Sequence, residues 1–156
     1  MLALRSIFFA LLLPGTVTLL LPYFILSRRA VPHWDAIGLP GLVVILVGAT
    51  ILIWCIADFA RVGRGTLAPV DPPKALVIRG LYRYVRNPMY VGVVLVQVGE
   101  SALFRSASLL LYAGIFFLIA NLFVMLYEEP TLRARFGESY AHYRRSVRRW
   151  IPRRVK

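Results

Sequence analysis

The sequence predicts an all-α integral membrane protein: a helical bundle of about four transmembrane helices, followed by a cytoplasmic interfacial helix at the C-terminus. Three observations predict it. Hydrophobic residues make up 59% of the 156 residues, and the mean hydropathy is +0.69, whereas soluble domains are nearer half apolar. The apolar residues lie in runs close to the roughly 20 residues that cross a bilayer. The basic residues, which give a net charge of +12, flank these runs.

We expect four spans within a single domain that covers residues 1–156. The first, at about 6–26, is interpreted as a retained span, because its apolar run is longer than that of a signal peptide and no clear cleavage site follows. The second covers about 38–60. The third, at about 89–104, is short for a full crossing and is expected to tilt or to thin the bilayer. The fourth, at about 107–127, is the most uniformly apolar.

Only the link Phe104-Arg105-Ser106 separates the third span from the fourth. So short a link predicts a tight antiparallel hairpin. Asn121 is the strongly polar residue of the fourth span, and we expect it to form a hydrogen bond between helices. Gly41 and Gly48 in the second span would allow close approach of a helix from the same chain or from another copy. The oligomeric state stays open.

The distribution of basic residues predicts the orientation. With four spans, 16 of the 19 Lys and Arg lie on one side, in the N-terminus, the 61–88 loop and the tail. The positive-inside rule then places both termini and this loop in the cytoplasm, in a multi-pass protein of the cytoplasmic membrane. We do not expect nucleic acid as a partner, because the basic residues flank hydrophobic spans instead of forming a free patch.

The tail is predicted to form an interfacial helix. Its aromatic and apolar residues recur at helical spacing with arginines between them, and aromatic rings favour the headgroup level while arginines favour anionic lipid. These residues are Tyr140, Tyr143, Val147, Trp150 and Ile151. His142 among them is interpreted as a solvated or interfacial histidine.

Two polar clusters lie at the cytoplasmic ends of the third and fourth spans, so the hairpin is expected to bring them together. Arg83 and Arg86 in the first cluster suit a carboxylate or a phosphate. Asn87 precedes Pro88 and is therefore biased toward an extended backbone that leaves its polar groups available to a ligand. Tyr82 and Tyr90 add rings and hydroxyls. The alternative interpretation is contact of an Arg- and Tyr-rich boundary with lipid headgroups.

The second cluster is Glu128-Glu129-Pro130. Carboxylates at a helix C-terminus lie at the unfavourable end of the helix dipole, so a positive partner is expected. One interpretation is a structural ion pair with Arg133 or Arg135. The other is that one carboxylate faces the bundle and binds a cationic or hydroxyl-rich ligand. Successive helical residues point about 100° apart, which predicts different partners for the two, and Pro130 is expected to break or restart the helix.

A metal site is not expected. The single Cys55 excludes an internal disulfide and a cysteine zinc cluster. The two histidines, His33 and His142, lie far apart in the sequence.

Both clusters resemble motifs of a known group of enzymes. Residues 80–92, GLYRYVRNPMYVG, resemble the G-x-Y-x-x-x-R-H-P-x-Y-x-G segment of the isoprenylcysteine carboxyl methyltransferase and phospholipid N-methyltransferase families of integral membrane methyltransferases. Residues 128–152, with EEPTL, FGESYAHY and RWIP in that order, resemble their E-E-x-x-L, F-G-x-x-Y-x-x-Y and R-x-x-P ending. The resemblance covers about 69–152.

The resemblance implies S-adenosylmethionine as the cofactor and methyl transfer to a lipophilic acceptor at the cytoplasmic membrane face. The cofactor-binding residues that the resemblance implies are Asn87, Pro88, Tyr90, Glu128 and Glu129, and the chemistry of the first cluster adds Tyr82 and Arg83. The candidates for a catalytic role are Arg86, Asn87 and Tyr90. One departure matters, because Asn87 stands where these families usually have His, and an asparagine cannot act as a general base.

Three questions stay open at the level of the sequence. The acceptor is a prenylated thiol or peptide, a phospholipid amine or another lipophile, and whether the methyl goes to oxygen, nitrogen or sulfur is undetermined. One alternative function is an NADPH-dependent membrane reductase related to the sterol reductases, which have a similar R-H-P-N-Y segment with Asn where this chain has Met89. Another is a non-catalytic lipid-binding or assembly protein.

Overall fold

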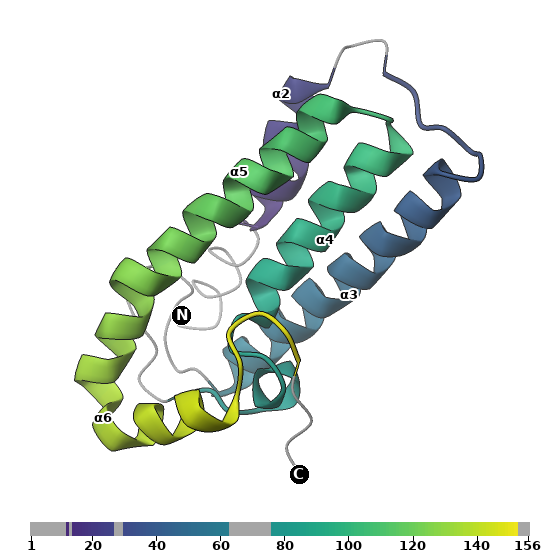
Figure 1. Cartoon of the computed structure of the whole chain (residues 1–156). Coiled ribbons are helices and arrows are strands. Elements are labelled where there is room, and N and C mark those ends of the chain that lie inside the picture. Colours follow the sequence, from purple (N-terminus) through teal and green to yellow (C-terminus); the bar gives the residue numbers. More distant parts are fainter. Residues whose placement is uncertain (1–11, 13, 27–29, 63–75, 153–156) are drawn as a thin grey trace.

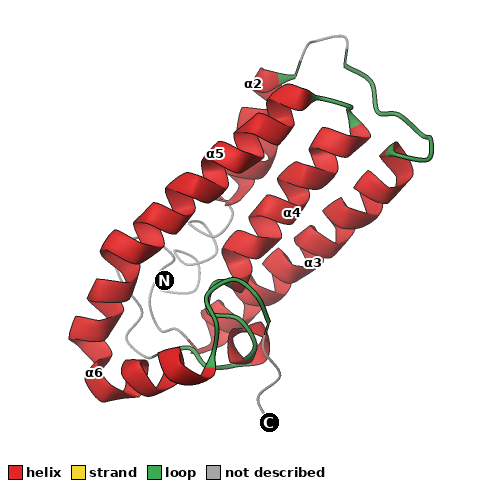
Figure 2. Ribbon diagram, in the orientation of Figure 1, coloured by secondary structure: helices red, strands yellow, loops and turns green. Residues whose placement is uncertain are grey.

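The structure is a computed structural model that describes residues 12, 14–26, 30–62 and 76–152. The regular elements of these residues are helical (Figures 1 and 2). With η marking a π-helix or a 3-10 turn, they are η1 (Thr16–Leu20), α2 (Leu21–Ile25), α3 (Gly38–Val62), η2 (Gly80–Arg83), α4 (Pro88–Leu103), α5 (Ala107–Phe123), η3 (Val124–Glu128) and α6 (Glu129–Ser146). The prediction of an all-α protein is confirmed.

Two helices of the described residues are long and apolar enough to cross a membrane, over Gly38–Asp58 and Ala107–Ser146. The first agrees with the expected span at 38–60. The expected span at 89–104 is the shorter apolar helix α4, and only part of the expected span at 6–26 is described, as the helical residues Thr16–Ile25. The structure therefore supports two long spans directly and leaves the count of four as a proposal.

The closest contact between helices joins α3 and α4, which run side by side in Figure 1. A Cβ on Gly48 would lie 2.7 Å from the carbonyl oxygen of Gly92, and a Cβ on Gly99 would lie 2.6 Å from that of Gly41. No side chain fits in such gaps, so the two backbones touch at both points. The close approach expected of Gly41 and Gly48 is confirmed, and it occurs within the chain.

The hairpin predicted between α4 and α5 is also present. Arg105 turns the chain with a φ of 49°, and the Ser106 side chain accepts a hydrogen bond from the Leu109 N–H at the start of α5. Arg105 also forms an ion pair with Asp35, in the loop before α3. The backbone N–H groups of Gly38 and its neighbour donate to Asp35 and lower the pKa of its carboxyl. The loop ends of α3 and of the hairpin are thereby joined.

The first described helix is held to the hairpin by one carbonyl group. In a π-helix each carbonyl accepts from the N–H five residues ahead, and for Val17 that residue is Pro22, which has no N–H. The Val17 carbonyl instead accepts from Gln97 Nε2 of α4 at 3.2 Å and from the Tyr112 hydroxyl of α5 at 2.9 Å. The proline thus creates the acceptor that docks this helix.

The expectation that Pro130 breaks or restarts the helix is confirmed in part: the chain stays helical, but a new helix, α6, starts at Glu129 with Pro130 in its first turn. The π-turns of η3 bond the Glu129 N–H to the carbonyl of Val124, five residues back, and widen the helix where the proline ring must fit. The helix bends later, at Gly137, whose φ of 50° and ψ of −124° are non-helical. Beyond this bend α6 crosses the end of the bundle (Figure 1).

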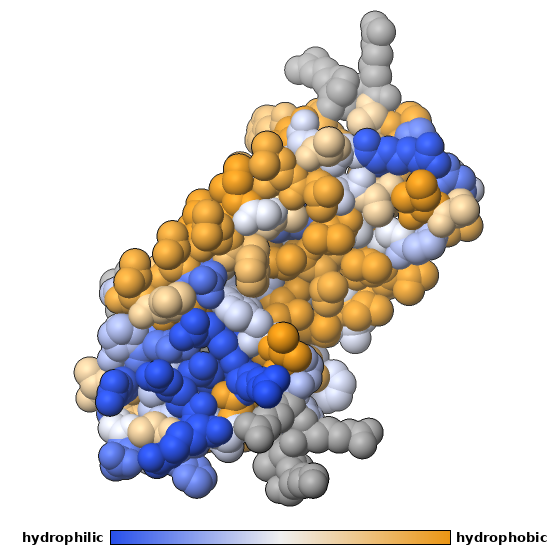
Figure 3. Space-filling view, in the orientation of Figure 1, coloured by the Kyte–Doolittle hydropathy of each residue, from blue (hydrophilic) through white to orange (hydrophobic). Residues whose placement is uncertain are grey.

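The surface alternates along the bundle. Hydrophobic residues cover the visible sides of α3, α4 and α5, whereas hydrophilic residues gather mainly at the end that carries α6, with a smaller hydrophilic patch at the opposite end (Figure 3). Exposed apolar side chains follow α3 and α5, for example Val43 and Ile53 on α3 and Leu111 and Leu118 on α5. Such a surface is expected of a helical bundle whose middle faces lipid.

The glycine contacts give a first prediction. Changing Gly99 to Ala should lower the thermal unfolding midpoint of the detergent-purified protein, because the new methyl group meets the Gly41 backbone and overpacking costs about 1–3 kcal/mol. Gly114 in α5 is the matched control, since a Cβ there meets nothing within 4 Å. Gly114→Ala should leave the midpoint unchanged or raise it. Equal midpoints for both variants would contradict the close packing.

Candidate functional site

The structure brings the two polar clusters together where α4 begins and α5 passes into α6. The Tyr90 hydroxyl of α4 donates to Glu128 Oε2 at 3.4 Å. Arg86, just before α4, lies with its Nη1 3.1 Å from Glu129 Oε1. Each glutamate therefore has its own partner from the first cluster, as the 100° step between neighbouring helical residues predicts.

Glu129 is the centre of a buried ion cluster. Its carboxylate is paired with Arg86 and also accepts two hydrogen bonds from Arg149, from Nε at 2.7 Å and from Nη2 at 3.0 Å. Glu129 is only 8% exposed, so two guanidinium groups offset the cost of burying its charge. The same hydrogen bond raises the pKa of Arg149. The suggested ion pair with Arg133 or Arg135 is wrong.

The tail brings Arg149 to this cluster by pairing with the segment before α4. Val85 and Arg148 form a parallel β-bridge, the Arg86 N–H donates to the Arg148 carbonyl at 2.9 Å, and Asn87 Nδ2 donates to the Arg149 carbonyl at 3.3 Å. Asn87 has the non-helical backbone expected before a proline, with φ −123° and ψ 54°. Part of its amide is thus used to hold the tail.

Aromatic rings lie beside the Tyr90–Glu128 pair. The Trp150 ring meets Tyr90 edge to face at 6.3 Å between centroids and meets Phe117 at 5.1 Å. Trp150 Nε1 donates to Asn121 Oδ1 at 3.0 Å. The hydrogen bond expected of Asn121 therefore goes to the tail, and the expectation of a second spanning helix as its partner is wrong.

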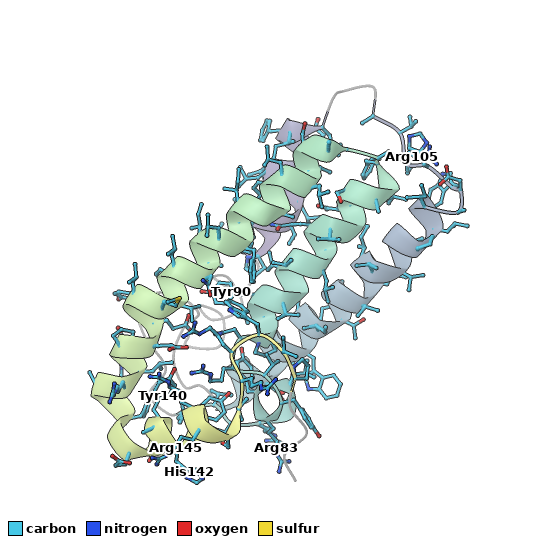
Figure 4. The ribbon with its side chains drawn as sticks, viewed as in Figure 1. Arg83, Tyr90, Arg105, Tyr140, His142 and Arg145 are labelled. Atoms are coloured by element: carbon cyan, nitrogen blue, oxygen red, sulfur yellow. The ribbon has the colours of Figure 1, made fainter. Side chains whose placement is uncertain are left out.

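Not every predicted site residue lies in this cluster. Pro88 and Asn87 are buried at the start of α4. The carbonyl of Tyr82 accepts from the Tyr143 hydroxyl at 2.6 Å, and burial raises the pKa of the Tyr82 phenol. Arg83 is exposed and lies at the outer end of the molecule, away from Tyr90 (Figure 4). Arg83 is therefore not brought to Glu128 or Glu129.

The prediction that the tail stripe faces lipid is wrong for most of its members. Tyr140, Tyr143 and Val147 are buried together, and Trp150 contacts Tyr90 as described above. Only Ile151 is largely exposed, at 65%. The bend at Gly137 turns the apolar face of α6 onto the end of the bundle, which hydrophobic burial favours. His142 is exposed, as expected.

The cluster leaves two groups available to a ligand. Arg86 Nε is buried and has no hydrogen-bond partner within the described part of the chain. Glu128 makes no ion pair with any described residue; its contact is the neutral Tyr90 hydroxyl. A free guanidinium N–H and a carboxylate without a cation, in one cluster, match a ligand that carries both an anionic and a cationic group.

The comparison with known proteins gives one family. A model of the phospholipid methyltransferase family matches residues 37–139. The chain belongs to this family. The matched residues include α3, the α4–α5 hairpin, Glu128 and Glu129. Arg149 and Trp150 lie beyond the match. The resemblance found in the two sequence motifs is thereby confirmed at the level of the family.

One similar curated protein comes from Haemophilus influenzae. It is described as an uncharacterized protein and is 32% identical over 63 residues, which are 40% of this chain and the whole of that protein. No solved structure matches the chain.

The sequence did not predict Arg149 as the partner of Glu129, although the position of Arg149 in the R-x-x-P ending was the available signal.

The ion cluster gives a second prediction. Glu129→Gln should lower the free energy of unfolding by about 3 kcal/mol or more, because Arg86 would stay buried without its countercharge. Denaturant unfolding in detergent, followed by tryptophan fluorescence, measures this. Glu138 is the matched control, since its side chain is 93% exposed. A variant Glu129→Gln as stable as Glu138→Gln would contradict the structural role of the cluster.

Proposed function

We propose that the protein is an integral membrane methyltransferase that uses S-adenosylmethionine and acts on a lipophilic acceptor at the cytoplasmic membrane face. Membership of the phospholipid methyltransferase family supports methyl transfer and a lipid substrate. The observation that carries the proposal for this chain is that one buried N–H of the site, Arg86 Nε, has no partner among the described residues, while Glu128 of the same site has no cation among them.

The proposed topology is four spans with both termini in the cytoplasm, within one domain over 1–156 whose cofactor-binding part covers about 69–152. Two long apolar helices and two shorter ones support it. The larger hydrophilic region in Figure 3 lies at the end that carries α6, whose first residue is Glu129, and the positive-inside rule places this end in the cytoplasm. The acceptor then reaches the site from the bilayer and the cofactor from the water.

The chemistry of S-adenosylmethionine fits the groups at the site. Glu128 would bind its ammonium or its ribose hydroxyls, and Arg86 would bind its carboxylate. The rings of Tyr90 and Trp150, already in contact, would stabilise the positive sulfonium. When bound, the cofactor supplies the methyl group. Pro88 and Asn87 fix the start of α4, and Tyr82 supports the segment before it, whereas Arg83 is too far out to take part.

The protein would contribute mainly positioning. An in-line displacement gains much of its rate from holding the two reactants in line. Asn87 cannot act as a base, and its Nδ2 already donates to the tail. Arg86 and Tyr90 remain the candidates for a catalytic role. The acceptor atom, a carboxylate oxygen or an amine nitrogen of a lipid, is left to experiment.

Calorimetric titration of the detergent-purified protein tests the cofactor. We expect saturable binding of S-adenosylmethionine and S-adenosylhomocysteine, and none of NADPH. Glu128→Gln should weaken binding at least about tenfold, because a charged hydrogen bond to the ligand is lost, while Glu138→Gln should not. Glu128 is a sharper test than Glu129, whose change also disturbs the ion cluster. Binding of NADPH alone would indicate a reductase, and binding of neither would indicate a non-catalytic protein.

Transfer of a labelled methyl group to membrane lipid extracts tests the acceptor. We expect label in the lipid fraction that depends on the wild-type protein and is lost in Glu128→Gln. Treating the product with alkali separates the two acceptor classes, because a methyl ester releases labelled methanol and an N-methyl group does not. Cofactor binding without any labelled lipid would contradict the proposed acceptor class.

A further inference from the structure

A group of basic residues lies on α6, outside the ion cluster around Glu129. An open surface cavity of about 290 Å³ is lined there by three exposed arginines with a tyrosine and an alanine. These residues are Arg133, Tyr140, Ala141, Arg144 and Arg145. Tyr140 and Arg145 lie at the hydrophilic end of the molecule in Figure 4.

The bend at Gly137 makes this cavity. Arg133 precedes the bend and Arg144 follows it, and a straight α-helix would hold them about three turns apart along its axis. The φ of 50° at Gly137 is a conformation that glycine adopts without steric cost. No heavy atom lies within 4 Å of a Cβ built there, so close packing does not explain the glycine. The positive φ explains the glycine at this position. The bend that this φ produces brings the arginines on its two sides around one cavity.

The charge inside the cavity is uncompensated. Arg133 and Arg144 form no ion pair with any described residue. Arg145 lies 3.8 Å from Glu138, but the side chains are 73% and 93% exposed, so water screens this contact and it is worth little. Three guanidinium groups around one cavity repel each other, and an anion between them would remove that repulsion.

Tyr140 gives the cavity a buried polar floor. The residue is 2% exposed, and its hydroxyl oxygen accepts from Arg86 Nη1 at 3.5 Å. The hydroxyl hydrogen donates to no described residue. Arg86 in turn pairs with Glu129, and the cavity therefore lies directly behind the ion cluster.

We propose that this cavity binds a phosphate group. Phosphate offers several oxygens to several donors at once, and guanidinium groups match it with paired hydrogen bonds. A carboxylate, with two oxygens, would leave part of the donor set unused. The same chemistry is presented by the headgroup of an anionic phospholipid and by a free phosphate. The site shares no residue with the Tyr90–Glu128 pair, although its Tyr140 contacts Arg86, and phosphate binding is measured separately from methyl transfer.

Calorimetric titration of the full-length protein in detergent, at constant ionic strength, tests the site with two probes. Inorganic phosphate represents the free anion, and dihexanoyl phosphatidic acid below its micellar concentration represents the lipid. We expect saturable binding that falls about tenfold or more in the double variant Arg144→Gln/Arg145→Gln. The matched control is Arg135→Gln/Arg148→Gln, which removes the same charge from exposed side chains outside the cavity. Tighter binding of the lipid probe would identify a headgroup site, and equal binding a site for free phosphate.

Two results would overturn the proposal. One is no saturable binding of either probe to the wild-type protein. The other is an equal loss of affinity in both double variants, which would show only the general attraction of a basic surface. If the Arg144→Gln/Arg145→Gln protein does not fold, as judged by its helical circular dichroism, Arg133→Gln on the other side of the bend replaces it with the same expected loss.

Discussion

The end of the bundle depends on one buried carboxylate. Glu129 accepts from Arg149 of the tail and pairs with Arg86 of the segment before α4. It thereby ties two distant segments to the long helix that runs from Ala107 to Ser146. None of the three charges is stable in this place alone, because desolvating an ion is costly unless it is paired. The start of α4, the path of the tail and the position of Trp150 beside Tyr90 all follow from this interaction.

The apolar part of the bundle depends on a different constraint, the absence of side chains. Glycines at two levels of α3 face glycines of α4, and the backbones meet where a Cβ would not fit. Helices in lipid gain little from hydrophobic burial, so close backbone packing is a main source of their association. The rigid pair α3–α4 then fixes where Asn87 and Tyr90, at the first turn of α4, are presented. The two constraints act at different depths and together define the site.

Much of this arrangement could be predicted from the sequence, for identifiable reasons. Apolar runs and a three-residue link determine the hairpin, and the hairpin determines that residues 82–90 meet Glu128 and Glu129. The surroundings of the tail could not be predicted in this way, because a stripe of Tyr140, Tyr143 and Val147 is equally suited to packing against lipid and against protein. What decides between them is the bend at Gly137, and a lone glycine does not reveal its φ. Arg149 was missed because ion-pair spacing along one helix points to Arg133 and Arg135, whereas the actual partner arrives through a β-bridge.

The carbonyl group that Pro22 leaves open at Val17 has a consequence for biogenesis. During synthesis the N-terminal segment leaves the ribosome before α4 and α5 exist. In hydrocarbon a carbonyl without a donor costs several kcal/mol, and the two donors, Gln97 and Tyr112, belong to the hairpin made later. The two hydrogen bonds that dock the first helix therefore form only after residues 80 and 95 positions further along the chain have been made.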